Sequence, residues 1–177
     1  MEIPDVRPIV DLVSLALYSG GLKGRSQVSM LLCAPSDSGK TTLIMDRFTE
    51  NLGVSVTNMT TRIGLAKWLF KPGDEHYRGL HHLIMPDVSA QLGEERANGP
   101  LETFLMELVY GGLKNYHSLH LPSINVGKPV IIGLIGGMVP ETLKRRQHHW
   151  AAYGLLRRFL PVSYSYTRKQ IASLQEL

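Results

Sequence analysis

Apolar residues recur along the chain with two spacings, one typical of helices and one typical of strands. Five segments carry apolar side chains every three or four residues, the spacing of a helix packed on one side. The expected helices cover residues 5–19, 40–51, 61–70, 101–110 and 140–159. Five shorter runs are apolar throughout or alternate apolar with polar residues, as strands do. The expected strands cover residues 27–33, 54–57, 79–85, 129–135 and 162–166, and residues 168–177 begin a further helix.

This alternation predicts an α/β domain with three layers. Helical stretches of ten or more residues between strands favour crossover connections and a largely parallel sheet. Strands that are apolar on both sides fit a sheet covered on both faces. We therefore expect a five-stranded, mostly parallel sheet flanked by helices in a single domain over residues 1–177. Residues 1–24 are expected to form a helical linker, 25–166 the core, and 167–177 the start of a truncated helix.

Composition agrees with one soluble domain. The chain has 177 residues, of which 44% are hydrophobic and 19% charged, ordinary values for a globular protein. The single cysteine, Cys33, excludes an intrachain disulfide and favours the reducing cytoplasm. The acidic start argues against a signal peptide. No run approaches the ~18 consecutive apolar residues of a membrane span, so we expect no membrane partner.

The charge of the chain permits a polyanionic partner without requiring one. The net charge is +4, which makes the domain mildly basic. Seven of the cations follow residue 143, together with the histidines at 148 and 149: Lys144, Arg145, Arg146, Arg157, Arg158, Arg168 and Lys169. This cluster is compatible with contacts to nucleic acid or to a phosphate group across a subunit boundary.

The segment APSDSGKT, residues 34–41, carries the most specific pattern in the chain. It matches the P-loop pattern G-x-x-x-x-G-K-[ST] with Ala34 at the first glycine, and it lies between an expected strand and an expected helix. In this pattern, loop N–H groups and the helix N-terminus bind phosphate. Lys40 neutralises the β and γ oxygens, Thr41 binds Mg²⁺, and Gly39 lets the backbone pass close. The expected nucleotide-binding residues are Ala34, Pro35, Ser36, Asp37, Ser38, Gly39, Lys40, Thr41 and Thr42.

A P-loop also needs a carboxylate that holds the metal through water at the end of a neighbouring strand. Asp87 follows the apolar run 83–85 and lies 47 residues beyond Lys40. The sequence therefore predicts Asp87 as the second Mg²⁺ residue, with an aspartate in a strand-end turn as the alternative. We expect ATP and Mg²⁺ as ligands, with GTP as the open alternative and no other metal.

The segment GLLRRFLPV, residues 154–162, resembles the arginine-finger segment of AAA+ ATPases. It is similar to the RRF stretch of the Clp unfoldases and the LLSRFD stretch of the minichromosome-maintenance helicases. In those families the arginine before the phenylalanine reaches the γ-phosphate of a neighbouring subunit, and by position this is Arg158. The resemblance covers most of the chain and implies a P-loop ATPase that forms a homo-oligomeric ring, with a hexamer as one candidate. The alternative for Arg158 is a solvated helix end.

Three positions depart from the AAA+ pattern. ATPases of this additional-strand class usually place a glutamate after the metal-binding aspartate, but position 88 is valine, with Glu94 or Glu95 as possible substitutes. A polar sensor usually ends the fourth strand, where Gly136-Gly137-Met138 stands and Thr142 is the nearest hydroxyl. The helical lid is absent or truncated to residues 167–177. Hydrolysis is therefore expected to be slow or to use another residue.

The segment Lys114–Lys128 precedes the fourth strand, where AAA+ helicases insert a hairpin that grips DNA. We favour a plain surface connection, with a DNA-contacting hairpin as the alternative. The adjacent pairs His81-His82 and His148-His149 do not have the spacing of a shared metal site, which requires i,i+2 on a strand or i,i+4 on a helix.

The leading functional hypothesis is an ATPase that couples ATP to work on DNA, as helicase, loader or translocase. Its expected catalytic residues are Lys40, Asp87 and Arg158. A protein-remodelling AAA+ ATPase is the second hypothesis, and a nucleotide-gated regulator or scaffold with little hydrolysis is the third. A small-molecule kinase is disfavoured because residues 88–128 offer only Arg96 for an arginine-rich lid.

Overall fold

The computed structural model describes residues 7–22, 27–41, 53–58, 61–73, 75–89, 92, 99–118 and 121–165. The helices are α1 (Arg7–Tyr18), the short η1 (Ser19–Gly21), α3 (Arg62–Leu69), α5 (Gly99–Met106), the π-helical η2 (Glu107–Gly111) and α6 (Pro140–Ala152). The strands are β1 (Ser29–Cys33), β2 (Val54–Val56), β3 (His82–Met85), β4 (Leu113–Ser118), β5 (Leu121–Val130), β6 (Gly133–Met138) and β7 (Phe159–Ser163). Within these residues, no helix is long and apolar enough to cross a membrane.

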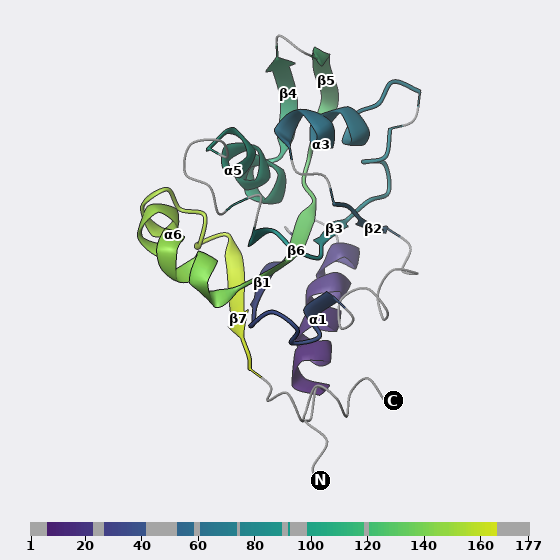
Figure 1. Ribbon diagram of the computed structural model, residues 1–177. Helices are drawn as coiled ribbons and strands as arrows, with labels where there is room; N and C mark the ends of the chain where they lie inside the picture. The colour runs from purple at the N-terminus through teal and green to yellow at the C-terminus, as the bar shows by residue number, and fades with distance from the viewer. Residues whose placement is uncertain are drawn as a thin grey trace.

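Five strands form one parallel sheet in the order β2-β3-β6-β1-β7. Helices cover both of its faces, with α1 on one side and α3, α5 and α6 on the other (Figure 1). This arrangement confirms the expected α/β class, the five parallel strands and the flanking helices. The helix in the segment expected to be a linker packs on the sheet, because Ile9 and Val13 of α1 are buried against it.

The strand order explains which face each helix covers. The steps from β2 to β3, from β3 to β6 and from β6 to β7 all run in the same direction across the sheet. Right-handed crossovers in one direction place their helices on one face, and α3, α5 and α6 lie together on that face. The step from β1 to β2 runs in the opposite direction. The neighbours β1 and β6 therefore send the chain opposite ways from their carboxyl ends, a switch point where open α/β sheets bind ligands.

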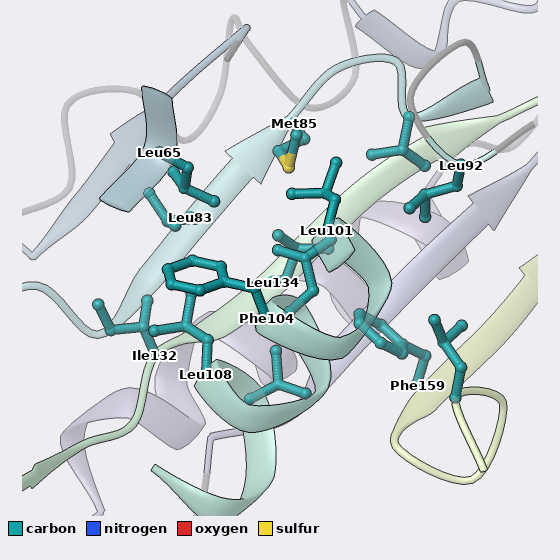
Figure 2. Close-up of a cluster of buried hydrophobic side chains, with 14 of the residues drawn as sticks. Leu65, Leu83, Met85, Leu92, Leu101, Phe104, Leu108, Ile132, Leu134 and Phe159 are labelled. Atoms are coloured by element: carbon teal, nitrogen blue, oxygen red, sulfur yellow. The ribbon is translucent and has the colours of Figure 1, made fainter. Parts of the chain in front are cut away.

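The core is divided between the two faces by the alternation of side chains along the strands. Leu31 and Cys33 of β1 belong to the larger cluster beneath α3, α5 and α6, whereas Met30 and Leu32 pack under α1. Figure 2 shows part of the larger cluster, in which Phe104 from α5 lies near Leu108, Leu134 and Ile132. The sheet is thus packed against helices on both faces, which holds the carboxyl ends of its strands in place.

The fourth strand of the parallel sheet starts later than predicted. Residues 129–135 were expected to form it, but Pro129 and Val130 end β5, and β6 covers Gly133–Met138. Proline has no N–H for a central ladder, so it is accommodated in the two-stranded ribbon instead. The strand continues through Gly136-Gly137, although the sequence pattern predicts that it stops there. Glycine is needed at these two positions because the neighbouring residues lie too close for a side chain.

The last helix and strand are also displaced from their predicted bounds. The helix ends at Ala152 instead of near residue 159, and Gly154 adopts a left-handed φ of 80° just beyond it. β7 covers Phe159–Ser163 instead of 162–166. Its Pro161 is tolerated because β7 is an edge strand of the sheet. The expected helix at 168–177 and all but the first two residues of the helix at 40–51 lie outside the described residues.

The favoured interpretation of Lys114–Lys128 as a plain surface connection is wrong. The segment forms an antiparallel ribbon of β4 and β5, which projects from the body of the molecule beyond α3 (Figure 1). Leu113, Val126 and Val130 are buried and hold the base of the ribbon on the core. The register is irregular between the two strands, so the periodic pattern that identifies a hairpin is weak in the sequence.

Candidate nucleotide-binding site

The P-loop leaves the sheet at the switch point between β1 and β6. β1 is flanked by β6 and β7 and is fully buried along its length. Directly after it, the N–H of Ala34 donates a hydrogen bond of 3.1 Å to the carbonyl of Met138 at the end of β6. The loop is therefore anchored to two neighbouring strand ends, and its following residues extend from the carboxyl edge of the sheet.

The loop backbone alternates between two conformations. Asp37 has a φ of 60° and Gly39 a φ of 74°, whereas the residues on either side of Asp37 do not have positive φ. Such alternation turns successive N–H groups toward one side and forms an anion-binding nest. A Cβ at Gly39 would meet no atom within 4 Å. Glycine is favoured at this position because of its left-handed backbone conformation.

The amine of Lys40 lies inside the loop. Its Nζ donates hydrogen bonds to the carbonyl of Ala34 at 2.6 Å and to that of Pro35 at 2.7 Å, and it is 3.4 Å from the Oγ of Ser38. Burial lowers the pKa of Lys40, while the charges of Asp87, Asp37 and Glu141 oppose that shift. The amine thus lies within the loop that forms the nest, and three carboxylates favour its charged form.

The other predicted loop residues take different positions. Ser38 is buried, while Pro35, Ser36, Asp37 and Thr41 are exposed. Thr41 follows Lys40 directly and shares its helical conformation. Thr42 lies outside the described residues.

Asp87 follows β3 and lies on the same edge of the sheet as the loop. It is exposed, its Oδ1 accepts a 2.7 Å hydrogen bond from the N–H of Ser89, and its charge acts on Lys40. The Oγ of Ser89 in turn accepts a hydrogen bond of 3.0 Å from the N–H of Val139. These contacts tie the ends of β3 and β6 together and hold the carboxylate beside the P-loop.

Val88 occupies the position where a glutamate would stand, and its surroundings are apolar. Its side chain is completely buried, and its N–H donates a 2.7 Å hydrogen bond to the carbonyl of Gly137. A Cβ on Gly136 would lie 3.2 Å from a methyl group of Val88. The backbone thus directs residue 88 into the core, away from the loop. Glu94 and Glu95 lie outside the described residues.

Glu141 is a residue that the sequence analysis did not single out. It lies in the first turn of α6, two residues after the N-cap Val139, and its charge is among those acting on Lys40. It is exposed. The available signal was Val139-Pro140-Glu141, a proline and an acid at the start of a helix that follows a strand of the sheet directly.

Arg158 is not brought to the P-loop of its own chain. It precedes β7, whose Phe159 lies beside Ser29 at the start of β1, whereas the loop follows the end of β1. Its Nη1 donates a 2.7 Å hydrogen bond to the carbonyl of Gly154, and its guanidinium lies 5.2 Å from the centre of the Tyr110 ring. Within one chain the structure thus brings together Lys40 and Asp87 but not Arg158.

The histidine pair at the start of β3 serves packing. The Nδ1 atoms of His81 and His82 are 2.8 Å apart, and Nε2 of His82 lies 3.0 Å from the carbonyl of Val28. His82 must donate to that carbonyl, so its Nδ1 accepts from His81 when both rings are neutral. Burial lowers the pKa of His82 to about 4. The pair joins β3 to the segment before β1, far from the loop.

The described residues contain no group of three or more histidine, cysteine, aspartate or glutamate side chains that could hold a metal ion. Magnesium does not need such a group, because it keeps several waters and takes phosphate oxygens as ligands. The Thr41 hydroxyl and the Asp87 carboxylate fit that requirement. Cys33 is not a ligand candidate, since burial raises the pKa of its thiol to about 11.

In comparisons with known proteins, the chain matches no protein-family model and no curated protein sequence.

Proposed function

We propose that this chain is a P-loop ATPase that binds ATP with Mg²⁺ and couples it to work on DNA. The observation that carries the proposal is the position of Lys40, whose amine is held by loop carbonyls while the Asp87 carboxylate acts on it from a strand end two places away in the sheet. A cation in a nest of N–H groups next to a metal-binding carboxylate suits a nucleoside triphosphate.

The described residues divide the work of binding. The loop N–H groups surround the β-phosphate, and Lys40 exchanges its carbonyl partners for β and γ oxygens. Thr41 supplies a hydroxyl to the metal, and Asp87 supplies a carboxylate through water. Magnesium, when bound, neutralises charge on the phosphates. Because Ala34 and Pro35 lose their contacts with the amine in this exchange, binding also rearranges the loop.

The strand order supports the resemblance to the additional-strand class. A whole strand, β6, stands between the P-loop strand β1 and the strand that ends before Asp87, the kind of insertion after which the class is named. The carboxylate must then approach the loop across the end of β6. Gly137 permits this approach, since a Cβ there would lie 2.2 Å from the carbonyl oxygen of Pro86.

A ring of identical subunits would supply Arg158 from a neighbour. The proposal is supported by the position of this arginine, which precedes β7 at the amino end of the sheet and cannot serve the loop of its own chain. In a neighbour's site its charge would stabilise the charge that develops on the transferred phosphoryl group. Arg158 would first have to leave Gly154 and Tyr110.

DNA is the proposed polymer because the ribbon of β4 and β5 precedes the fourth strand of the sheet, the point at which AAA+ helicases insert a hairpin that contacts DNA. Lys114 and Lys128 of this ribbon are exposed, and the net charge of +4 favours a polyanion. A protein-remodelling ATPase with the same core remains the second candidate for the partner.

A nucleotide-gated regulator with little turnover is favoured by a different observation. Val88 is buried in the core, and Met138 at the end of β6 is buried as well, so neither place offers a polar group to the γ-phosphate. Stoichiometric ATP binding with no phosphate release over hours would establish this alternative.

The test of the main proposal measures ATP binding by calorimetry and phosphate release with and without DNA, over a range of protein concentrations. We expect binding that requires Mg²⁺, and activity that rises with protein concentration and with DNA. Arg158→Ala should lose turnover and keep ATP binding. Activity that is independent of concentration and unaffected by Arg158→Ala would exclude the ring, and absence of ATP binding would exclude the P-loop function.

A further inference from the structure

The carboxyl edge of the sheet leaves one chemical role without an obvious residue, the acceptor of a proton from the water that attacks ATP. In the AAA+ pattern a glutamate after the metal-binding aspartate has this role, but Val88 points into the core here. Any replacement must lie on the same edge and must not be the carboxylate that holds the metal.

The charges that act on Lys40 identify the candidates among the described residues. Three carboxylates do so: Asp87, Asp37 and Glu141. Asp87 is required for the metal. Asp37 is part of the loop itself, at a left-handed position that turns the N–H groups toward the phosphate. Glu141 is the one of the three that belongs neither to the loop nor to the metal-binding strand end.

The backbone around Glu141 is fixed to both halves of the site. The carbonyl of Met138 accepts the N–H of Ala34 at the start of the P-loop, at 3.1 Å. The N–H of Val139 donates to Ser89, whose own N–H donates to Asp87. Pro140 then begins α6 and Glu141 follows in its first turn. The chain that carries Glu141 is thus hydrogen-bonded to the loop on one side and to the Asp87 turn on the other.

Glu141 is also free of the partners that its helix offers. Lys144 and Arg145 lie three and four residues further along α6, the spacings at which a glutamate pairs with a cation. No ion pair joins them among the described residues, although all three side chains are exposed. Its carboxylate is therefore exposed and makes no ion pair with a cation of its own helix.

We propose that Glu141 is the general base of ATP hydrolysis, in place of the missing glutamate at position 88. Its carboxylate accepts a hydrogen bond from the attacking water and takes its proton as the oxygen bonds to the γ-phosphorus. The bond from the γ-phosphorus to the bridging oxygen breaks, ADP leaves with that electron pair, and Glu141 releases the proton to solvent. This inference rests on the proposed function, since it requires that the P-loop bind ATP.

The test compares the wild-type chain with Glu141→Gln and Glu141→Asp, and uses Glu107→Gln as a matched control at an exposed glutamate of η2. Two quantities are measured: kcat and KM for ATP, and the identity of the nucleotide that stays bound after gel filtration. A general base contributes about 10²–10⁴ in rate. We expect Glu141→Gln to lower kcat about 100-fold or more, leave KM within about threefold, and retain ATP where wild type retains ADP. Glu141→Asp should recover part of kcat, and Glu107→Gln should match wild type.

Two results would overturn the assignment while leaving the ATPase proposal intact. One is turnover by Glu141→Gln within about threefold of wild type. The other is a joint loss of ATP binding and turnover, which would mean that Glu141 supports the loop or the start of α6. If wild type binds ATP without hydrolysing it, both the hydrolysis and the general base are excluded, and if wild type does not bind ATP, the P-loop function itself fails.

Discussion

Two regions of the molecule hold a cation close to carboxylates, and they do so in different ways. Between α5 and α6, Arg146 and Glu102 expose only 3% and 5% of their side chains and are 2.9 Å apart. Trp150 donates a second hydrogen bond to the same carboxylate oxygen, at 3.0 Å. At the P-loop, the hydrogen bonds of Lys40 among the described residues are to atoms of its own loop, and Asp87 and Glu141 are exposed.

The difference separates charges that hold the fold from charges that the proposed function assigns to ligand binding. Glu102 is held in the interior by three side chains of α6, Arg146, His149 and Trp150, so its carboxylate is committed to the α5–α6 contact. Lys40 is held by carbonyls that a phosphate can replace, and its carboxylate neighbours do not touch it in an ion pair among the described residues. Stability and ligand binding should therefore respond to different substitutions.

The largest expected effect is on the buried pair. Glu102→Ala leaves the guanidinium of Arg146 buried without its carboxylate and removes the partner of the Trp150 indole. Breaking a buried pair costs about 3–5 kcal/mol, so urea unfolding should show a loss of that order. Glu107→Ala, at an exposed glutamate nearby, should change the free energy of unfolding by less than about 0.5 kcal/mol. Equal effects of the two substitutions would contradict the structural role of Glu102.

The second effect is on stability at low pH, through His82. Its folded-state pKa is about 4 because the ring is buried, while an unfolded histidine titrates near 6.5. Between these values the unfolded chain binds a proton that the folded chain does not, so the free energy of unfolding falls as pH falls from 6.5 to 4. The loss amounts to up to about 3 kcal/mol, measurable by urea unfolding at several pH values.

The control for this pH dependence is His82→Asn, whose side chain cannot take up a proton in this range. The amide can still donate a hydrogen bond toward the carbonyl of Val28. The variant should be less stable at pH 7.5 and should show a flatter pH dependence below 6.5. An unchanged slope in His82→Asn would assign the acid sensitivity to other groups.

The third effect is on ligand affinity at the P-loop. Lys40→Ala should weaken ATP binding about 100-fold or more, equivalent to about 2.8 kcal/mol, because the phosphates lose their central cation. The free energy of unfolding should change by about 1 kcal/mol or less, since the hydrogen bonds of the amine among the described residues are to loop carbonyls and the Ser38 hydroxyl. Calorimetry with ATP measures the first quantity, and Lys144→Ala on α6 is the matched control. Retained affinity in Lys40→Ala would break the proposed distinction between the two regions.

The two regions also differ in how far the sequence predicts them. The P-loop depends on consecutive residues, so its pattern is visible in the sequence, whereas the left-handed φ of Gly39 and the hydrogen bonds of Lys40 to loop carbonyls are seen only in the structure. The α5–α6 pair joins residues 44 positions apart, and no local pattern links Glu102 to Arg146. The periodicity of apolar residues identified the strands and helices. It gave wrong bounds where contacts between neighbouring strands determine where a strand begins and ends.

Long-range contacts explain the particular errors. The two glycines inside β6 are read as a stop unless the neighbouring Pro86 and Val88 are known. Glu141 was missed for the same reason, since only the order of strands brings the start of α6 to the P-loop. The sequence places Arg158 in a helix that ends near residue 159, whereas it directly precedes β7, and its own-chain contact with Tyr110 could not be foreseen from spacing.

The smallest expected effect tests whether the two strand ends at the P-loop are held as closely as the proposal requires. In Gly137→Ala, the new Cβ would lie 2.2 Å from the carbonyl oxygen of Pro86 and 3.8 Å from Cδ of Lys40. Backbone atoms cannot yield as a flexible side chain does, so the turn that carries Asp87 must move. Overpacking of this kind costs about 1–3 kcal/mol, and the displaced carboxylate should raise the Mg²⁺ concentration needed for ATP binding. Gly127→Ala is the control, because nothing lies within 4 Å of its Cβ position. If Gly137→Ala lowered stability and left the Mg²⁺ requirement unchanged, Asp87 would belong with the charges that hold the fold.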